Sequence, residues 1–184
     1  MGRAQEGNSP MNFKIALVAS ALALGVAGCM TPMASAPPAA VTSAAVFVPT
    51  AASSNLFEIE SSRLALRRAR DPEVRRFARQ MIRDHNLATR RMAAVLRNSG
   101  MPVPPPALNA KHQQMLATVE SAPDFDAAYV NAQLMAHQEA VALFTSYSSS
   151  GDVPQLAAFA GQTLPTLQMH LDHVQALSGG APAM

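Results

Sequence analysis

Four polar side chains interrupt the apolar stripes of this sequence and are its best candidates for chemistry. Glu58, His85, His137 and His170 each stand where the three- and four-residue spacing of apolar residues would otherwise continue along a helix. One carboxylate and three imidazoles suit zinc, copper, nickel or iron, and helical bundles build such sites in their cores. The alternative is a structural polar layer of hydrogen-bonded core residues.

These four residues are expected at one level of the folded chain. With a turn near residue 70, Glu58 lies about 12 residues before it and His85 about 15 after it, a difference of about 4 Å along the helices. His137 is level with His85 by the same counting, and His170 is offset by about 6 Å, which a kink at the preceding proline could change. The sequence therefore predicts a polar layer near the midplane, able to hold a metal ion or a proton.

Other polar and sulfur-bearing residues have weaker assignments. Asp84 is expected to orient a histidine from outside the ligand set, or to join the ligands. His112 and His173 are expected outside the cluster. Met81 lies one turn before His85 and is interpreted first as a gap-filling core residue, with a copper-binding role as the weaker alternative.

The elements that must position these residues are helices. The absence of Trp, the few aromatic residues and the abundance of Ala, Leu and Met indicate an all-α domain. Asp, Pro and Gly residues mark where its helices start and stop, and they divide the domain into two long helical hairpins. Two such hairpins form a four-helix bundle. The apolar stripe expected after Asp124 contains Val130, Leu134, His137, Val141 and Phe144. The first expected helix ends near Ala69, with Pro49 as a candidate kink. The other four run from Asp71 to Gly100, from about 108 to 120, from Asp124 to Gly151, and onward from Pro154.

Charge is distributed unevenly between the hairpins. Residues 58–100 contain 11 Arg and 5 acidic residues, whereas residues 111–184 contain one Lys and 6 acidic residues. One interpretation is a solvated basic face with attraction between the hairpins. The other is a surface that docks on anionic lipid or another polyanion in the envelope. Nucleic acid is not expected as a partner, since no aromatic residues interleave with the basic ones. The candidate surface consists of Arg67, Arg68, Arg75, Arg76 and Arg79.

The only cysteine, Cys29, indicates where the protein resides. An apolar run from Ile15 to Val26 precedes Val26-Ala27-Gly28-Cys29, and Lys14 provides the basic flank of a secretory signal. This pattern is typical of a bacterial lipoprotein, in which cleavage leaves an acylated Cys29 that anchors the chain to a membrane. The residues after Cys29 favour the periplasmic face of the outer membrane. Met11 makes a more natural start than Met1, so residues 1–10 are interpreted as a misassigned start.

The expected domain organisation follows. Residues 1–28 are a lipoprotein signal peptide, and residues 29–42, rich in Ala, Pro, Ser and Thr, are a lipidated flexible tether. Residues 43–178 form the four-helix bundle domain, a size suited to one core. Residues 179–184 are a disordered tail.

Several segments together resemble a bacterial secreted family of unknown function, often labelled "predicted outer membrane protein". The resemblance covers about residues 43–178 and implies a ferritin-like four-helix bundle with no established activity or cofactor. The two Glu-x-x-His motifs of di-iron bundles are missing, which argues against oxidase or iron-storage chemistry. The segments that carry it are Asn55–Glu60, Asp71–Ala78, Met81–His85, Phe125-Asp126, Tyr129, His137 and Leu164–Leu171.

Two functional hypotheses remain from the sequence. The first is a non-catalytic periplasm-facing lipoprotein that acts in envelope maintenance or stress by binding a partner, since no Ser-His-Asp set or free thiol nucleophile is apparent. The second is a metal-binding or metal-dependent redox bundle with zinc, copper or iron as its cofactor, held by the Glu58, His85, His137 and His170 layer.

Overall fold

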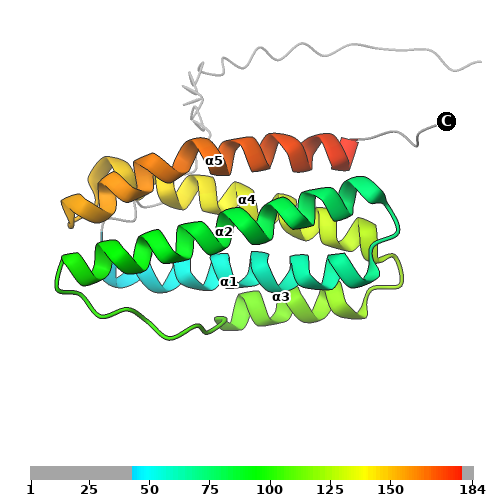
Figure 1. Cartoon of the computed structure of the whole chain (residues 1–184), viewed down its shortest axis with the longest axis horizontal. Helices are drawn as coiled ribbons and strands as arrows, with labels where there is room; N and C mark the ends of the chain where they lie inside the picture. Colours follow the sequence, from blue (N-terminus) through cyan, green and yellow to red (C-terminus); the bar gives the residue numbers. More distant parts are fainter. Residues whose placement is uncertain (1–42, 180–184) are drawn as a thin grey trace, which may run out of the picture. The chain divides into compact units, whose positions relative to one another are not determined.

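The computed structural model describes residues 43–179, and α-helices make up most of this segment (Figure 1). The predicted signal peptide 1–28, the tether 29–42 and nearly all of the tail 179–184 lie outside the described residues. No helix within residues 43–179 is long and apolar enough to cross a membrane. The helices are α1 (Ala44–Arg68), α2 (Pro72–Asn98), α3 (Ala110–Ser121), α4 (Phe125–Ser150) and α5 (Pro154–Gly179).

The helix ends fall where the sequence predicted them, for local reasons. Asp71 caps α2 by accepting a hydrogen bond from the Glu73 N–H at 2.7 Å, and proline occupies the first helical position, where its missing N–H costs nothing. At the other end, Gly100 adopts a φ of 68°, and the Met101 N–H donates to the Leu96 carbonyl at 2.9 Å. This left-handed turn closes the helix at a residue without a Cβ.

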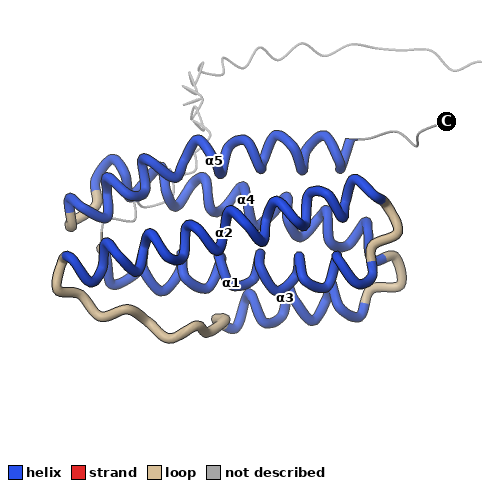
Figure 2. Tube along the Cα trace, viewed as in Figure 1, coloured by secondary structure: helices blue, strands red, loops and turns tan. Residues whose placement is uncertain are grey.

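The long helices pair as two antiparallel hairpins, α1 with α2 and α4 with α5, and α1 also packs on α4 and α2 on α5. Figure 2 shows the long loop that leaves α2, runs back along the bundle and reaches α3, which packs against α1 and α4. One long crossover between two hairpins is the connectivity of ferritin-like bundles. The predicted all-α four-helix bundle, with a short extra helix in the central connection, is confirmed.

The core is divided into two apolar clusters. The Phe77 cluster includes Phe57, Phe77, Met81, Tyr129 and Val174, and the Phe47 cluster includes Phe47, Met92, Phe144, Leu156 and Leu167. Each long helix contributes to both clusters. The three histidines lie in the sequence between the two contributions of their helices, and Glu58 directly follows Phe57 of the Phe77 cluster. The polar layer therefore separates two apolar halves of one bundle.

The expected apolar stripe of α4 is rotated in the structure. Gln133 is fully buried, whereas Leu134 and Val141 are only partly buried against the clusters. The spacing rule identified the face of α4 to within one residue, and packing against α1 and α5 determined which residue of each turn points inward.

Asp152 joins the start of the bundle to the α4–α5 turn. One carboxylate oxygen, Oδ1, accepts hydrogen bonds from the Ala44 N–H at 2.8 Å and from the Tyr147 hydroxyl at 2.9 Å. The Tyr147 ring stacks on Phe47, with centroids 4.0 Å apart. The carboxylate thus satisfies an N-terminal amide of α1 and a buried phenol together.

We expect Asp152→Ala to lower the free energy of unfolding by about 1–2 kcal/mol, because it leaves a helix N–H and the Tyr147 hydroxyl unpaired. Asp172→Ala is the matched control, since Asp172 is exposed and accepts a hydrogen bond only from Gln168 in the preceding turn. Urea denaturation of both variants measures the difference. Equal stability of the two variants would contradict this role for Asp152.

Candidate metal centre

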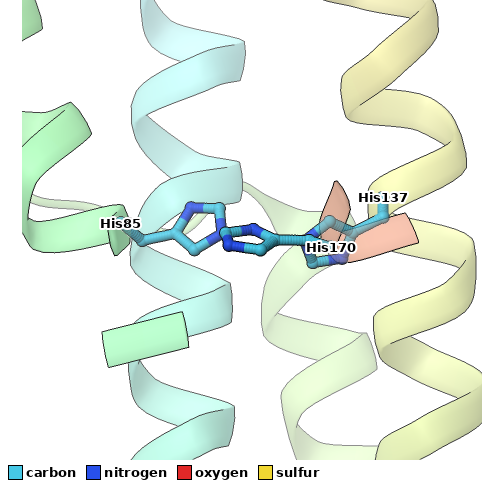
Figure 3. Close-up of side chains that lie close together, drawn as sticks. All are labelled: His85, His137 and His170. Atoms are coloured by element: carbon cyan, nitrogen blue, oxygen red, sulfur yellow. The ribbon is translucent and has the colours of Figure 1, made fainter. Parts of the chain in front are cut away.

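Three imidazole rings from three helices converge in the middle of the bundle. His85 of α2, His137 of α4 and His170 of α5 each offer one ring nitrogen, and these nitrogens all lie within 4.8 Å of one another (Figure 3). The ring centroids are 5.4–5.7 Å apart. The three residues, which we call the histidine triad, are at most 2% exposed.

Glu58 and Asn55 of α1 hold the first ring of the triad. His85 Nδ1 lies 2.7 Å from Glu58 Oε2 and 2.8 Å from Asn55 Oδ1. Both neighbours are acceptors, so Nδ1 carries the proton and donates it. The Nε2 atom of His85 has no hydrogen-bond partner among the described residues.

The other two rings are held in a similar way. His137 Nδ1 donates to the backbone carbonyl of Gln133 at 2.8 Å, with Glu58 Oε1 at 3.8 Å. His170 Nε2 donates to Asp84 Oδ2 at 2.9 Å. A carboxylate or carbonyl on one ring nitrogen fixes the tautomer and the orientation of the ring, as partners of metal-bound histidines do.

The opposite nitrogen of every ring has no partner. His85 Nε2, His137 Nε2 and His170 Nδ1 are buried without a hydrogen bond among the described residues. An unsatisfied buried polar atom costs about 1–3 kcal/mol, so three in one place need an explanation. Three unpartnered imidazole nitrogens in one buried cluster suit a transition-metal cation, which binds imidazole nitrogen at about 2.0–2.1 Å.

Glu58, which the sequence predicted as a ligand together with the three histidines, lies beside the histidine triad. Its Oε2 faces the protonated side of His85, and its Oε1 is buried without a hydrogen bond. Asp84 lies against His170, the position expected of a residue that orients a ligand. The sequence predicted that these residues would lie together, but not which atoms would face the centre.

The electrostatics of the centre favour neutral His137 and His170 and an ionised Glu58. Burial lowers the pKa of His137, and it lowers the pKa of His170 to about 4 with help from the nearby His85 charge and against the pull of Asp84. Burial would raise the pKa of Glu58, but the charges of His85 and His137 outweigh it and bring the pKa to about 2. Near neutral pH, the lone pairs of His137 and His170 are thus available to a cation.

Sequence reasoning gave no role to two residues that support the layer. Asn55, three residues before Glu58 in α1, was not assigned to the site. Gln133 was overlooked, although it lies one turn before His137; its side-chain amide donates to Ser61 Oγ at 2.9 Å. Polar residues one turn from a candidate ligand were the available signal, since positions three or four apart share a helix face.

The remaining candidates lie outside the triad. His112 is buried. Its Nδ1 atom is hydrogen-bonded to Ser53 Oγ at 2.6 Å and its ring stacks on Phe57, so it fastens α3 to α1. His173 is half-buried with its ring edge against Phe77, and Met81 is a fully buried member of the Phe77 cluster.

The arginines of the predicted basic surface lie around the α1–α2 turn, and several are used within the protein. Arg68 donates to backbone carbonyls of Glu120 and Ala122 and covers the Phe125 ring. Arg75 donates to the Ala69 carbonyl, and Arg76 pairs with Glu73. Arg67 and Arg79 are exposed, and no side-chain partner within residues 43–179 engages them.

The fold and the site define an all-α bundle with a buried histidine triad, a candidate metal-binding module. The sequence matches the family described as Domain of unknown function (DUF4142) over residues 29–177, and the chain belongs to this family. Membership in a helical family of unknown function, which the sequence resemblance implied, is confirmed. No curated protein matches the chain in sequence.

Solved structures share the fold. CopM in the Cu(II)-bound form matches with a TM-score of 0.62 and 19% identity, covering 74% of this chain and 95% of CopM. CopM in the Ag-bound form matches with a TM-score of 0.60 and 18% identity, covering 74% and 96%. A DUF305 fragment from Deinococcus radiodurans matches with a TM-score of 0.62 and 19% identity, covering 73% and 93%. At these identities the likeness establishes the fold.

We predict that the metal-free protein loses stability as the pH falls from 6.5 to 4. The unfolded chain takes up protons on its histidines near pH 6.5, whereas His170 in the folded protein stays neutral to about pH 4. The low pKa of Glu58 adds a further loss between pH 4.5 and 2, because the unfolded chain then takes up a proton at Glu58 while the folded protein keeps this carboxylate ionised. Denaturation of chelator-treated protein between pH 8 and 3 measures the trend.

The variant that isolates this effect is His170→Gln, which cannot titrate. Its stability should fall less steeply between pH 6.5 and 4, with a difference on the order of 3 kcal/mol for a pKa displaced from 6.5 to about 4. Parallel pH profiles for the two proteins would show that His170 is not held neutral by the fold.

Proposed function

We propose that this protein binds a transition-metal cation at the histidine triad. The observation that carries the proposal is that each ring of this buried cluster, from α2, α4 and α5, keeps one nitrogen without a partner, and the rings bring nitrogens within 4.8 Å of one another. A structural polar layer would pair these atoms with one another or with neighbouring groups. The triad instead pairs only the outer nitrogen of each ring, which leaves the inner ones for a ligand.

The charge of the surroundings supports a divalent ion. Glu58 and Asp84 each contact a triad ring, and together they would place two negative charges beside a bound cation. Two carboxylates offset the charge of one divalent ion, which lowers the cost of burying it. Neutral imidazole ligands suit zinc, copper, nickel and iron. Glu58 and Asp84 act in this proposal by orienting the rings, and the Oε1 atom of Glu58 remains available as a further ligand.

The structural neighbours support the binding of a metal ion by a bundle of this fold, without indicating which metal or which ligands. CopM, which shares the fold, has been solved in Cu(II)-bound and Ag-bound forms. The ligands proposed here come from this chain's own geometry. We take the bundle to be a non-catalytic binding module, in which the triad is enclosed by core side chains.

We expect protein purified without a chelator or a histidine tag to contain a transition metal, and the metal-free protein to melt at a higher temperature when zinc, copper, nickel or iron is added. At a free metal concentration of one hundred times Kd, the gain in stability should be about 2.7 kcal/mol. Elemental analysis and thermal melts measure these quantities. Absence of metal and no melting shift with any of these ions would overturn the proposal.

His137→Leu is the sharpest variant, because His137 lies 3.8 Å from the buried Glu58 carboxylate and its removal keeps the closer partner, His85, in place. Its Nδ1 partner is a helix carbonyl, whereas removal of His85 would leave the buried Glu58 carboxylate without its closest partner. We expect His137→Leu to lower metal affinity at least a hundredfold while the metal-free stability is unchanged or raised, since an unpaired core nitrogen is removed. His173→Leu is the matched control and should bind normally.

We further propose that the module is an acylated, periplasm-facing lipoprotein of the outer membrane, on the Cys29 pattern alone. Fatty acyl chains contribute about 0.8 kcal/mol per buried methylene, so two or more anchor a protein stably. An anionic lipid or an envelope protein is the partner proposed for the arginine surface, and Arg67 and Arg79 are the members free to engage it. The metal site would then sit in a module tethered to the envelope.

Replacement of the acylation site tests the location. Cys29→Ala should move the protein from the membrane fraction to the periplasmic fraction, or leave the precursor uncleaved, because no thiol remains to accept lipid. Fractionation with mass spectrometry of the N-terminus measures both. Membrane-bound, acylated Cys29→Ala protein would refute the lipoprotein assignment.

A further inference from the structure

Asp84 is the point where the buried centre meets solvent. Its side chain is 29% exposed, whereas the side chains of Glu58 and of the histidine triad are at most 2% exposed. The inner face of the same carboxylate accepts from His170 Nε2 at 2.9 Å. One residue therefore contacts both the triad and the surface.

The outer face of Asp84 lines a groove between α2 and α5. The groove has a volume of about 210 Å³, enough for several water molecules or a partly hydrated ion. One wall is formed by α5 and carries the hydroxyl groups of Thr163 and Thr166 and the thioether of the exposed Met169, all of which can act as metal ligands. The other wall is formed by α2 and carries Leu87, Ala88 and Arg91, which is the only cation among the lining residues.

The wall formed by α5 is weakened beside this groove. Pro165 lies inside α5 between the two groove threonines and has no N–H to donate to the Gly161 carbonyl one turn earlier. The next turn carries Met169 and His170. A missing helix hydrogen bond makes local opening easier, and it occurs next to the triad ring that Asp84 holds.

We infer that this groove is the route by which a cation enters and leaves the triad, with Asp84 as its first ligand; the inference rests on the proposed metal site. The Asp84 carboxylate attracts the cation at the surface, and movement of the His170 ring passes it to the buried nitrogens. On the other side of the bundle, α3 covers α1 and α4, and His112 and Ser53 bond beneath it. The α2–α5 seam is thus the side on which a charged group reaches both solvent and a triad ring.

The test separates the rate of metal transfer from affinity. Zn²⁺ uptake by metal-free protein and its release to a chromophoric chelator are followed by stopped flow, and Kd is measured at equilibrium. Ala88→Phe fills the groove without touching a triad ring, so it should slow uptake and release by the same factor, at least fivefold, and leave Kd unchanged. Ala142→Phe, at an exposed position of α4, is the size-matched control and should change neither rate.

Asp84→Asn tests the carboxylate itself. The amide oxygen can still accept a hydrogen bond from His170 Nε2, so the ring stays oriented while the charge is lost. The rate of Zn²⁺ uptake should fall at least tenfold, and it should depend more strongly on Zn²⁺ concentration. Normal Kd with unchanged rates in Ala88→Phe would overturn the route. A change of Kd without a change of uptake rate in Asp84→Asn would assign Asp84 to ring orientation only and also overturn it. No Zn²⁺ binding by the wild-type protein would instead overturn the metal site itself.

Discussion

The carboxylate of Glu58, placed in the middle of an apolar core, is the constraint on which the rest of the structure depends. An ionised group that is 1% exposed is costly to bury unless donors surround it. Its partners come from other helices: His85 of α2 donates to it from 2.7 Å, and the His137 ring of α4 lies at 3.8 Å. A slide of one residue along any of these helices would separate the charge from its partners, so this one group sets the relative register of α1, α2 and α4.

The two apolar clusters show the same constraint from the other side. Each long helix contributes apolar side chains above and below the layer, and the polar residues lie where the helix passes from one cluster to the other. The clusters provide the stability that a layer with unpaired nitrogens lacks. Proteins tolerate such local violations of packing rules mainly at functional sites, and here the violation is confined to one level of the bundle.

The surroundings of the layer are asymmetric in a way that suits a binding site. The crossover brings α3 across α1 and α4. A buried hydrogen bond between His112 and Ser53 fastens α3 to α1 and closes that face. On the α2–α5 face, Asp84 reaches the surface, and α5 contains a proline within its helical run. The connectivity of the chain thus encloses one side of the triad and leaves a charged, accessible residue on the other.

The helix boundaries and the level of the four polar residues could be derived from the sequence, because capping residues act locally and a helix rises by a fixed 1.5 Å per residue. Counting residues along the helices therefore places Glu58, His85, His137 and His170 at one level. The sequence could not determine the rotation of each helix about its axis, which depends on packing against its neighbours. That rotation buried Gln133 in place of Leu134, turned Glu58 toward a ring proton, and left one nitrogen of each histidine facing the centre. Which atom of a residue faces its neighbours is decided by tertiary contacts, because rotamers and ring tautomers respond to partners that are distant in the sequence.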